Sequence, residues 1–246
     1  MNLPMNVCAF GDSVFINTAS SSFGIFEFDK YGTFLRYYPT PNKTDGFSVS
    51  LDGTKLLATE HWGTNIYIVD RETGTVTTKN FGSALVVPRG IADIGDGKIA
   101  ITSRGTCQFL IYDPSADTYA AYGTADFPNW NQNPGASDGP MDLHFDAQTG
   151  RLWMFGSACG LGYYDMQAGT FTRVDANRIF YHGLTFWKDS ILASVFSPSR
   201  VLKITPVAGQ TVYADSISYI SIGRRLNRIA IVDMPQIEDG TTIIFR

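Results

Sequence analysis

The amino-acid sequence predicts an all-β fold, and three observations support this prediction. A short turn that begins with aspartate recurs at intervals of about 40 to 50 residues, each time between two apolar segments of alternating pattern. The 24 glycines among 246 residues suit many tight turns, and the 44% of hydrophobic residues allow a sizeable core. This period, with four short strands per unit, is the signature of β-propeller blades. We therefore expect a single six-bladed β-propeller with four-stranded antiparallel blades.

The recurring turn fixes the phase of the repeat. Its copies begin at Asp29, Asp70, Asp113, Asp165 and, in degenerate form, Thr205. A second signal lies earlier in each repeat, for example at Asp52-Gly53 and Asp96-Gly97, where Asp-Gly between apolar runs favours a tight hairpin. Each repeat thus consists of three strands, the aspartate turn and a fourth strand.

The first three blades follow this order closely. The first is expected at Met5–Phe10, Ser13–Thr18, Gly24–Phe28 and Thr33–Tyr38. The second is expected at Gly46–Leu51, Lys55–Thr59, Asn65–Val69 and Thr75–Phe81. The third is expected at Gly90–Ile94, Lys98–Thr102, Gln108–Tyr112 and Thr118–Tyr122. Each segment is a short β-prone run that a turn signal bounds on both sides.

The next two blades keep the order with weaker turn signals. The fourth is expected at Pro140–Phe145, Arg151–Phe155, Gly162–Tyr164 and Thr170–Val174. The fifth is expected at Gly183–Phe186, Ser190–Val195, Val201–Ile204 and Thr211–Ala214. One insertion, residues 125–137, separates the third and fourth blades. The blades together span residues 5–39, 46–81, 89–124, 139–176, 182–215 and 218–246, so we expect one domain, 1–246.

The last blade differs from the others. Its strands are expected at Tyr219–Ile222, Arg228–Val232 and Thr241–Phe245, which makes it three-stranded. The edge that carries Thr241, Ile243 and Phe245 is uncharged and β-prone, and such edges recruit partner strands unless they are covered. The alternative is that Arg246 and neighbouring loops cap this edge within the chain.

The second blade resembles a known repeat. Residues 50–59 read SLDGTKLLAT and residues 66–76 read IYIVDRETGTV. This stretch is similar to the YVTN-type, NHL-like propeller repeat, and the other blades keep the strand order without the consensus. The resemblance implies a propeller fold. It implies no particular function, because proteins with this repeat include enzymes, binding proteins and surface proteins.

Composition excludes several classes of function. Only 17% of residues are charged and the net charge is −4, with no basic cluster larger than Arg224-Arg225, so a nucleic-acid-binding surface is not expected. No apolar run is long enough for a transmembrane helix, and the N-terminus does not resemble a signal peptide. We expect a protein made in the cytoplasm that stays there or leaves on a particle such as a virion. Cys8, Cys107 and Cys159 are expected to be structural.

The turns that enter the first strand of each blade offer the first candidate site. Asp45, Arg89, Asp138 and His182 each precede a glycine at blade spacing, so they are expected to converge near the mouth of the central channel. Two carboxylates, an arginine and an imidazole suit small-molecule or ion binding, or acid–base work. The alternative is structural, with these groups bonding to loop amides and neutralising one another.

The turns after the second strands lie on the same expected face. They contribute Glu60, His61, Trp62 and Arg104, and Trp130 lies in the nearby insertion. A carboxylate, an imidazole and an indole suit a sugar or a metal, and an exposed tryptophan suits a sugar ring or a protein contact. The alternative is that the insertion folds over its own aromatic residues.

No enzyme motif with a known spacing is present. The inner-strand residue sets of regucalcin-like hydrolases and of streptogramin-lyase-like propellers are also missing. We therefore expect a non-enzymatic binding or structural module without cofactors. Its partners would be protein subunits of a larger assembly, such as a phage tail or virus particle that recognises a host, with a surface glycan as a further option. The alternative is a hydrolase or lyase that uses a divalent metal such as calcium at Asp45, Asp138, His182 and Glu60.

Overall fold

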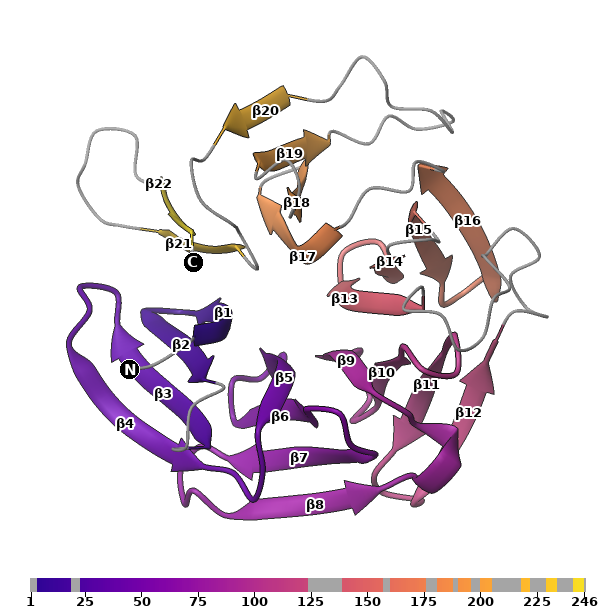
Figure 1. The fold of residues 1–246 in the computed structure, drawn as a ribbon, viewed down its shortest axis with the longest axis horizontal. Coiled ribbons are helices and arrows are strands. Elements are labelled where there is room, and N and C mark those ends of the chain that lie inside the picture. Colours follow the sequence, from indigo (N-terminus) through magenta and orange to yellow (C-terminus); the bar gives the residue numbers. More distant parts are fainter. Residues whose placement is uncertain are drawn as a thin grey trace.

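The protein forms a ring of β-sheets around a central axis, as the computed structural model shows (Figure 1). The structure describes residues 4–18, 23–123, 139–156, 160–175, 181–187, 190–195, 200–204, 218–221, 229–233 and 241–245. These residues form five four-stranded sheets and one two-stranded sheet, all antiparallel. The predicted fold class, an all-β propeller built of four-stranded blades, is therefore confirmed.

The strands follow the chain from the centre of the ring outward in each sheet. The first sheet contains β1 (Pro4–Phe10), β2 (Ser13–Thr18), β3 (Gly24–Asp29) and β4 (Phe34–Pro39). The second contains β5 (Thr44–Val49), β6 (Lys55–Glu60), β7 (Asn65–Asp70) and β8 (Val76–Asn80). A short 3₁₀ turn, η1 (Gly82–Ala84), precedes the third sheet, which contains β9 (Pro88–Asp93), β10 (Ile99–Ser103), β11 (Gln108–Asp113) and β12 (Thr118–Tyr122).

The remaining sheets complete the ring. The fourth contains β13 (Pro140–Asp146), β14 (Arg151–Gly156), β15 (Gly160–Asp165) and β16 (Thr170–Asp175). The fifth contains β17 (Tyr181–Trp187), β18 (Ser190–Val195), β19 (Arg200–Ile204) and β20 (Ser218–Ser221). The sixth contains β21 (Ile229–Asp233) and β22 (Thr241–Phe245), and β21 contacts both β17 and β1, which closes the ring.

The structure corrects the prediction for the last blade. The segment expected as its first strand, Tyr219–Ile222, overlaps β20, which pairs with β19 as the fourth strand of the fifth sheet. The strand expected in that place, Thr211–Ala214, lies outside the described residues. The sixth sheet therefore has two described strands instead of three, and β22 is its second strand.

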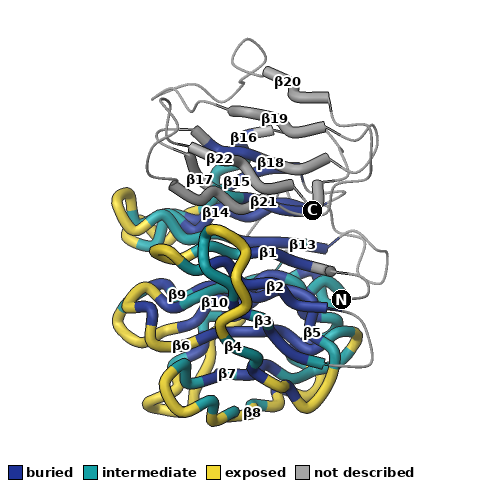
Figure 2. The backbone as a smooth tube through the Cα atoms, turned by 90° about the vertical axis from the view of Figure 1, so that its left-hand side faces the viewer, coloured by how far each residue is buried: buried dark blue, intermediate teal, exposed yellow. Residues whose placement is uncertain are grey.

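The core lies between neighbouring sheets. Successive side chains of a strand point to opposite faces, so one strand packs against two blades. Leu56 of β6 belongs to the cluster shared with the first sheet, together with Phe15, while Leu57 belongs to the cluster shared with the third sheet, together with Ile101. Figure 2 shows the result, with buried inner strands and exposed turns at the strand ends. Among the described residues, no helix is long and apolar enough to cross a membrane.

The recurring aspartates form the turns that the sequence predicts. Asp29 Oδ1 accepts hydrogen bonds from the backbone N–H groups of Tyr31 and Thr33, at 2.9 and 2.7 Å. Asp165 Oδ1 accepts equivalent bonds from the N–H groups of Gln167 and Ala168. Such aspartate-initiated turns replace the ladder hydrogen bonds that the chain loses when it reverses. They lie at the outer part of each blade, away from the central channel (Figure 1).

A shared irregularity marks the start of the inner strands. The register shifts near the first residues of β1, β5, β9, β13 and β17. In two blades the backbone N–H of a glycine instead donates to a threonine of the next strand, from Gly46 to Thr59 Oγ1 at 2.9 Å and from Gly90 to Thr102 Oγ1 at 2.6 Å. These irregularities turn the first residues of each inner strand toward the neighbouring blade.

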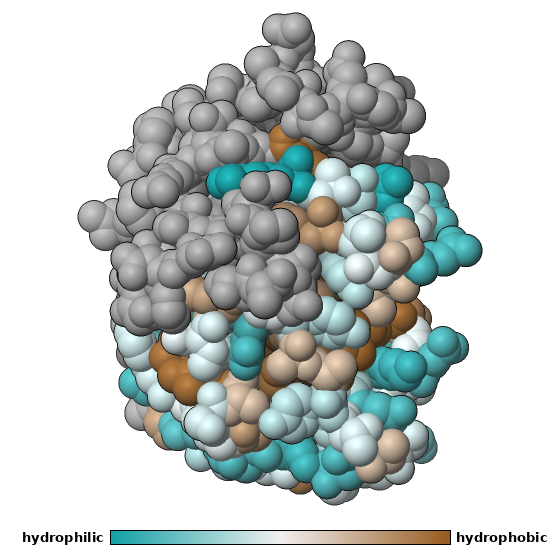
Figure 3. All heavy atoms as spheres, turned by 90° about the vertical axis from the view of Figure 1, so that its right-hand side faces the viewer, coloured by the Kyte–Doolittle hydropathy of each residue, from teal (hydrophilic) through white to brown (hydrophobic). Residues whose placement is uncertain are grey.

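The outer surface mixes polar and apolar side chains. On the side that Figure 3 shows, hydrophobic residues of the described chain lie among hydrophilic ones. This fits a sequence in which small polar residues replace much of the usual charge, since only 17% of residues are charged against about 25% in a typical soluble domain.

Candidate functional site

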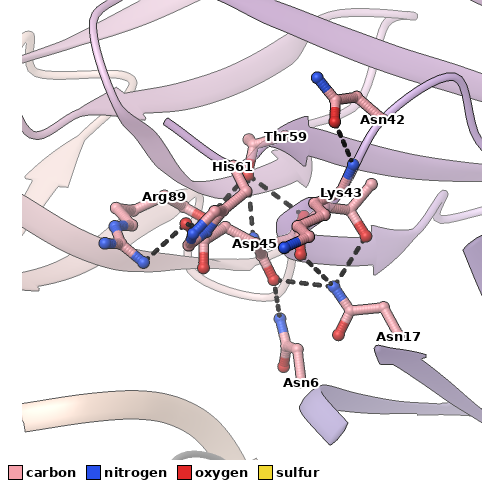
Figure 4. Close-up of polar contacts among 10 residues, drawn as sticks. Asn6, Asn17, Asn42, Lys43, Asp45, Thr59, His61 and Arg89 are labelled. Atoms are coloured by element: carbon pink, nitrogen blue, oxygen red, sulfur yellow. Dashed lines mark hydrogen bonds and ion pairs between the residues drawn. The ribbon is translucent and has the colours of Figure 1, made fainter. Parts of the chain in front are cut away.

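A network centred on Asp45 joins the second and third blades (Figure 4). Asp45 lies at the irregular start of β5 and is only 6% exposed. Its Oδ2 atom lies 2.6 Å from Arg89 Nη1 and 2.8 Å from His61 Nδ1. Arg89 comes from β9 and His61 from the turn after β6, so three segments meet at one carboxylate oxygen.

The backbone of Asp45 is fixed from the first blade. Asn17 Nδ2 donates to the carbonyl oxygens of Thr44 and Asp45 at 3.1 and 3.0 Å, and Asn6 Nδ2 lies 3.4 Å from the same Asp45 oxygen. Thr59 Oγ1 donates to the Arg89 carbonyl oxygen at 3.3 Å. Residues of three blades therefore hold the Asp45 network.

Trp62 presents an exposed aromatic surface beside this network. The Arg89 guanidinium lies 5.7 Å from the Trp62 ring centroid, and the His61 ring contacts the indole edge-on at 5.8 Å. The Trp62 residue is nevertheless 64% exposed. The buried ion pair thus supports a large aromatic side chain that faces solvent.

The backbone around Trp62 adopts an unfavourable conformation. Trp62 has a φ of 58°, and Val87, at the entry to β9, has a φ of 53°. The left-handed region is uncommon for bulky residues and is an outlier for β-branched ones. Gly63 bonds to both loops, since its N–H reaches the Glu60 carbonyl and its carbonyl accepts from Val87 N–H at 3.2 Å. Strain of this kind concentrates at binding sites that the surrounding fold over-determines.

Glu60 belongs to the framework of the turn. Its Oε1 accepts from Asn42 Nδ2 and from the Tyr67 hydroxyl, and its Oε2 accepts from the backbone N–H of Thr64 and from both nitrogens of Asn65. Burial and the Glu60 charge raise the pKa of the Tyr67 hydroxyl, which therefore remains a donor. Protein donors reach both Glu60 oxygens, whereas His61 Nδ1 contacts Asp45, so Glu60, His61 and Trp62 do not form one ligand set.

The structure places the other predicted residues as follows. Arg104 begins the turn after β10, where its N–H donates to the Val87 carbonyl at 3.3 Å. His182 lies on β17, but its side chain is outside the described part, as are Asp138 and Trp130. The partner-edge residues Thr241, Ile243 and Phe245 lie on β22, and their side chains are likewise not described.

The register reveals an acidic residue that sequence reasoning missed. Met141 of β13 corresponds to Asp45 and Arg89, and Asp142 corresponds to Gly46 and Gly90, because each strand shifts register at the same place. Asp138 therefore stands three residues too early to be the equivalent of Asp45. Asp142 is 3% exposed and its Oδ2 accepts from the Leu184 N–H of the next blade at 3.2 Å. Only strand pairing could show this offset, since a glycine follows Asp138 but not Asp142.

Protein groups engage both acidic side chains at the site. Asp45 Oδ2 is held by a cation and an imidazole, and the Glu60 carboxylate accepts from five donors. Within the described ranges, no three histidine, cysteine, aspartate or glutamate side chains gather closely enough to hold a metal ion. The exposed feature is the Trp62 surface.

Comparison with known proteins places the chain by its fold. No protein-family model and no curated protein sequence matches it. Among similar solved structures, virginiamycin B lyase from Staphylococcus aureus has a TM-score of 0.68 and 17% identity, covering 92% of this chain and 74% of that one. A chain of a nidogen/laminin complex has a TM-score of 0.72 and 14% identity, covering 92% and 84%.

A third similar structure matches over nearly the whole of both chains. The β-propeller domain of Cps50 (Swd1) from Myceliophteria thermophila has a TM-score of 0.60 and 12% identity, covering 100% of this chain and 99% of that one. At such identities the likeness concerns the fold alone. Because these structures are all β-propellers, this chain is a propeller-repeat protein.

Proposed function

We propose that this protein is a non-enzymatic binding module that contacts another protein through the face carrying Trp62. The observation that carries the proposal is the exposed indole, 64% accessible, on a strained turn that a buried ion pair supports. Tryptophan and arginine are the side chains most enriched at the energetic centres of protein interfaces. A rigid aromatic group also loses little conformational entropy when it binds.

The module is best explained as a subunit of a larger assembly. The outer edge of β22 supports this, because within the described residues β22 pairs only with β21, whereas the second strand of every other sheet pairs on both sides. An unpaired edge can accept a strand from a partner. A virion, including the host-recognising part of a phage tail, is one setting for such a subunit, and low charge is the feature that favours it.

The alternative of a metal-dependent hydrolase or lyase finds less support. Two of its four residues, Asp45 and Glu60, have their carboxylates engaged by protein donors. The likeness to virginiamycin B lyase is at 17% identity and carries no argument about activity.

The test compares two exposed aromatic residues. Affinity-tagged protein is purified from its native source as wild type, Trp62→Ala and Tyr31→Ala, and co-purifying proteins are quantified by mass spectrometry. Tyr31 is 69% exposed and lies on the turn between β3 and β4, so it is the matched control. We expect Trp62→Ala to reduce capture of a specific partner at least about tenfold, the loss expected for a central interface residue.

The control decides how the result is interpreted. Tyr31→Ala should retain the partner, and both variants should keep the thermal unfolding midpoint close to that of the wild type. Equal capture by wild type and Trp62→Ala, or equal loss in both variants, would contradict the proposal. A crosslinker installed at Trp62 should react with the same partner.

A further inference from the structure

A second surface lies on the side of the ring away from Trp62. Strand β6 ends opposite Thr44 at the start of β5, so Trp62 lies on the side where the inner strands begin. The other side consists of the turns that end the inner strands, residues 11–12, 50–54, 94–98 and 147–150, and those that end the third strands, residues 30–33, 71–75, 114–117 and 166–169. We call this side the turn face. In Figure 2, exposed turns project on the side of the ring away from the labelled N-terminus.

The turn face carries the exposed negative charge of the described chain. Every described acidic side chain except four lies in one of these turns or on the last residue of the strand before it, and none of them is buried. The four that lie elsewhere are all buried, namely Glu27, Asp45, Glu60 and Asp142. The negative charge that a partner would meet is therefore concentrated on one side of the ring.

Uncharged donors hold several of these carboxylates in the ionised state. The Thr73 backbone N–H lowers the pKa of Asp70, and the Ser115 hydroxyl lowers that of Asp113. Hydrogen bonds from the Ser50 hydroxyl and from Thr54 lower the pKa of Asp52 to about 2. Such donors stabilise the anion without cancelling its charge.

Positive side chains do not balance this charge. Among the described residues they are fewer on the turn face than the acidic ones: Lys30, Lys55, Arg71, Lys98 and Arg151. Lys30 pairs with Asp12 at 2.9 Å, and Arg71 pairs with the buried Glu27 at 2.7 Å. A surface of one sign attracts a partner of the opposite sign and repels like charge, which favours a basic protein segment over a nucleic acid or an anionic membrane.

Two exposed apolar side chains lie at the inner rim of the turn face. Phe10 ends β1 and is 37% exposed, Leu51 lies in the turn after β5 and is 48% exposed, and both line the central channel. A Cβ atom at Gly53 would lie 2.3 Å from Phe10 Cε1, so the Phe10 ring covers the turn that carries Leu51. The Leu51 N–H donates to Asp93 of the third blade at 3.0 Å. Tight turns favour small and polar residues, so the turn itself gives no reason for an exposed leucine.

We propose that the turn face binds a positively charged segment of a partner protein, with an apolar side chain of that segment against Phe10 and Leu51 and its lysine or arginine side chains beside Asp52 and Asp96. A metal ion is not the occupant that this face fits, because no three acidic, histidine or cysteine side chains of the described residues gather to hold one. The surface is separate from the Trp62 face and does not depend on the function proposed for that face.

The test measures the fluorescence anisotropy of three labelled peptides of equal length with the full chain. The first peptide has one leucine between two runs of lysine, the second has serine in place of the leucine, and the third has glutamate in place of the lysines. We expect saturable binding of the first, binding at least about fivefold weaker for the second, and none for the third. No saturable binding of the lysine–leucine peptide, or equal affinity for the first two peptides, would overturn the proposal.

A pair of leucine variants locates the apolar contact. Leu51→Ser should weaken binding of the lysine–leucine peptide at least about fivefold, because the apolar anchor loses its contact. Leu35→Ser is the matched control, since Leu35 is 52% exposed but lies on β4, the outermost strand of the first blade. Both variants should keep the thermal unfolding midpoint of the wild type. Equal affinity of Leu51→Ser and the wild type would contradict the site.

A pair of aspartate variants locates the charge. Asp96 and Asp117 both lie in turns of the third blade with φ values of 52° and 53°, which asparagine tolerates. Asp96 follows the inner strand and Asp117 the third strand, so Asp96→Asn should weaken binding about threefold or more, whereas Asp117→Asn should bind as the wild type does. Equal losses in both would mean a general attraction between charges and would overturn the proposal.

Two further variants complete the test. If Asp96→Asn does not fold, Asp52→Asn gives the same expected loss, since asparagine keeps an oxygen that can accept from the Thr54 N–H. Trp62→Ala should bind the lysine–leucine peptide as the wild type does, which separates this surface from the Trp62 face. A loss of peptide binding in Trp62→Ala would place the peptide on the wrong side of the ring and contradict the proposal.

Discussion

Single side chains join neighbouring blades, and Glu27 shows this most clearly. Its buried carboxylate accepts from Ser13 Oγ, Tyr38 Oη and Arg71 Nη2 at 2.7, 2.6 and 2.7 Å. Arg71 belongs to the second blade and also donates to the Gly53 carbonyl at 2.6 Å. Burial by itself would raise the pKa of Glu27, but the three hydrogen bonds and the Arg71 charge together lower it. This carboxylate therefore stays ionised and connects the first two blades.

We expect Glu27→Gln to destabilise the protein by about 2–3 kcal/mol, since it leaves the partly buried Arg71 without its counter-charge. Chemical denaturation at neutral pH measures the loss. Folding lowers the pKa of Glu27, so its ionised carboxylate stabilises the protein fully above the unfolded pKa. This stabilisation is lost as the pH falls through the folded pKa of Glu27. If Glu27→Gln has the same free energy of unfolding as the wild type at neutral pH, the Glu27–Arg71 ion pair contributes nothing to stability.

The strain at Trp62 gives a second prediction. Glycine adopts a φ of 58° without steric cost, whereas alanine does not. Trp62→Gly should therefore be more stable than Trp62→Ala by about 1 kcal/mol, although it removes more side chain. Thermal or chemical unfolding of the two variants measures this difference. The opposite order would mean that the turn changes conformation when the indole is removed.

His144 gives a prediction about pH. Burial lowers its pKa from 6.5 to about 4, so the unfolded chain binds a proton that the folded chain excludes. The stability that depends on a neutral His144 should be fully present above the unfolded pKa of 6.5. It should be lost progressively as the pH falls toward the folded pKa of about 4. We expect a loss of about 1–2 kcal/mol in the free energy of unfolding between pH 6.5 and about pH 5. His144→Gln should flatten the stability–pH curve in this window.

Among the elements, the inner strands determine how closely the blades approach. A Cβ atom at Gly46 would lie 1.6 Å from the Arg89 carbonyl oxygen, and one at Gly90 would lie 2.6 Å from the Leu143 nitrogen. Both contacts are with backbone of the following blade, which no rotamer change can relieve. These glycines are needed for close approach of strands, and their φ values are not in the left-handed region.

We expect Gly46→Ala to destabilise the protein by about 3 kcal/mol or more, because overpacking against backbone must move a whole blade. Gly123→Ala is the control, since a Cβ there would meet only Gln108 at 3.9 Å. Denaturant midpoints compare the two. Similar midpoints for both variants would mean that the inner strands can separate freely.

At the scale of the whole molecule, the ring closes through β21, which lies between β17 and β1. The sixth sheet nevertheless differs from the others, because β22 pairs only with β21 in the part of the chain that the structure describes. An antiparallel strand that is paired on one side leaves alternate N–H groups directed outward. Among the described strands, the outer edge of the sixth sheet therefore differs from the edges of the other sheets.

Hydrogen exchange tests this difference. Amides of β22 should exchange faster than those of β6, which is paired with β5 and β7, when the purified chain is measured alone. In the native assembly we expect β22 to gain protection while β6 stays unchanged. Equal protection of β22 and β6 in the isolated chain would mean that another part of the chain covers this edge.

The sequence by itself determined the repeat, the aspartate turns and the alternation of the strands, because each depends on residues close together in the chain. It also indicated that Asp45, Arg89, His61 and Trp62 share one face, and the structure brings these four together.

Only the tertiary structure decided the register and the partners of the strands. Residues 218–221 look like any β-prone segment, and only pairing with β19 assigns them to the fifth blade. Likewise, the shift at the start of β13 places Met141, and not Asp138, level with Asp45. Strand pairing depends on contacts between distant segments, and a local pattern of residues contains no information about which neighbour a strand will choose.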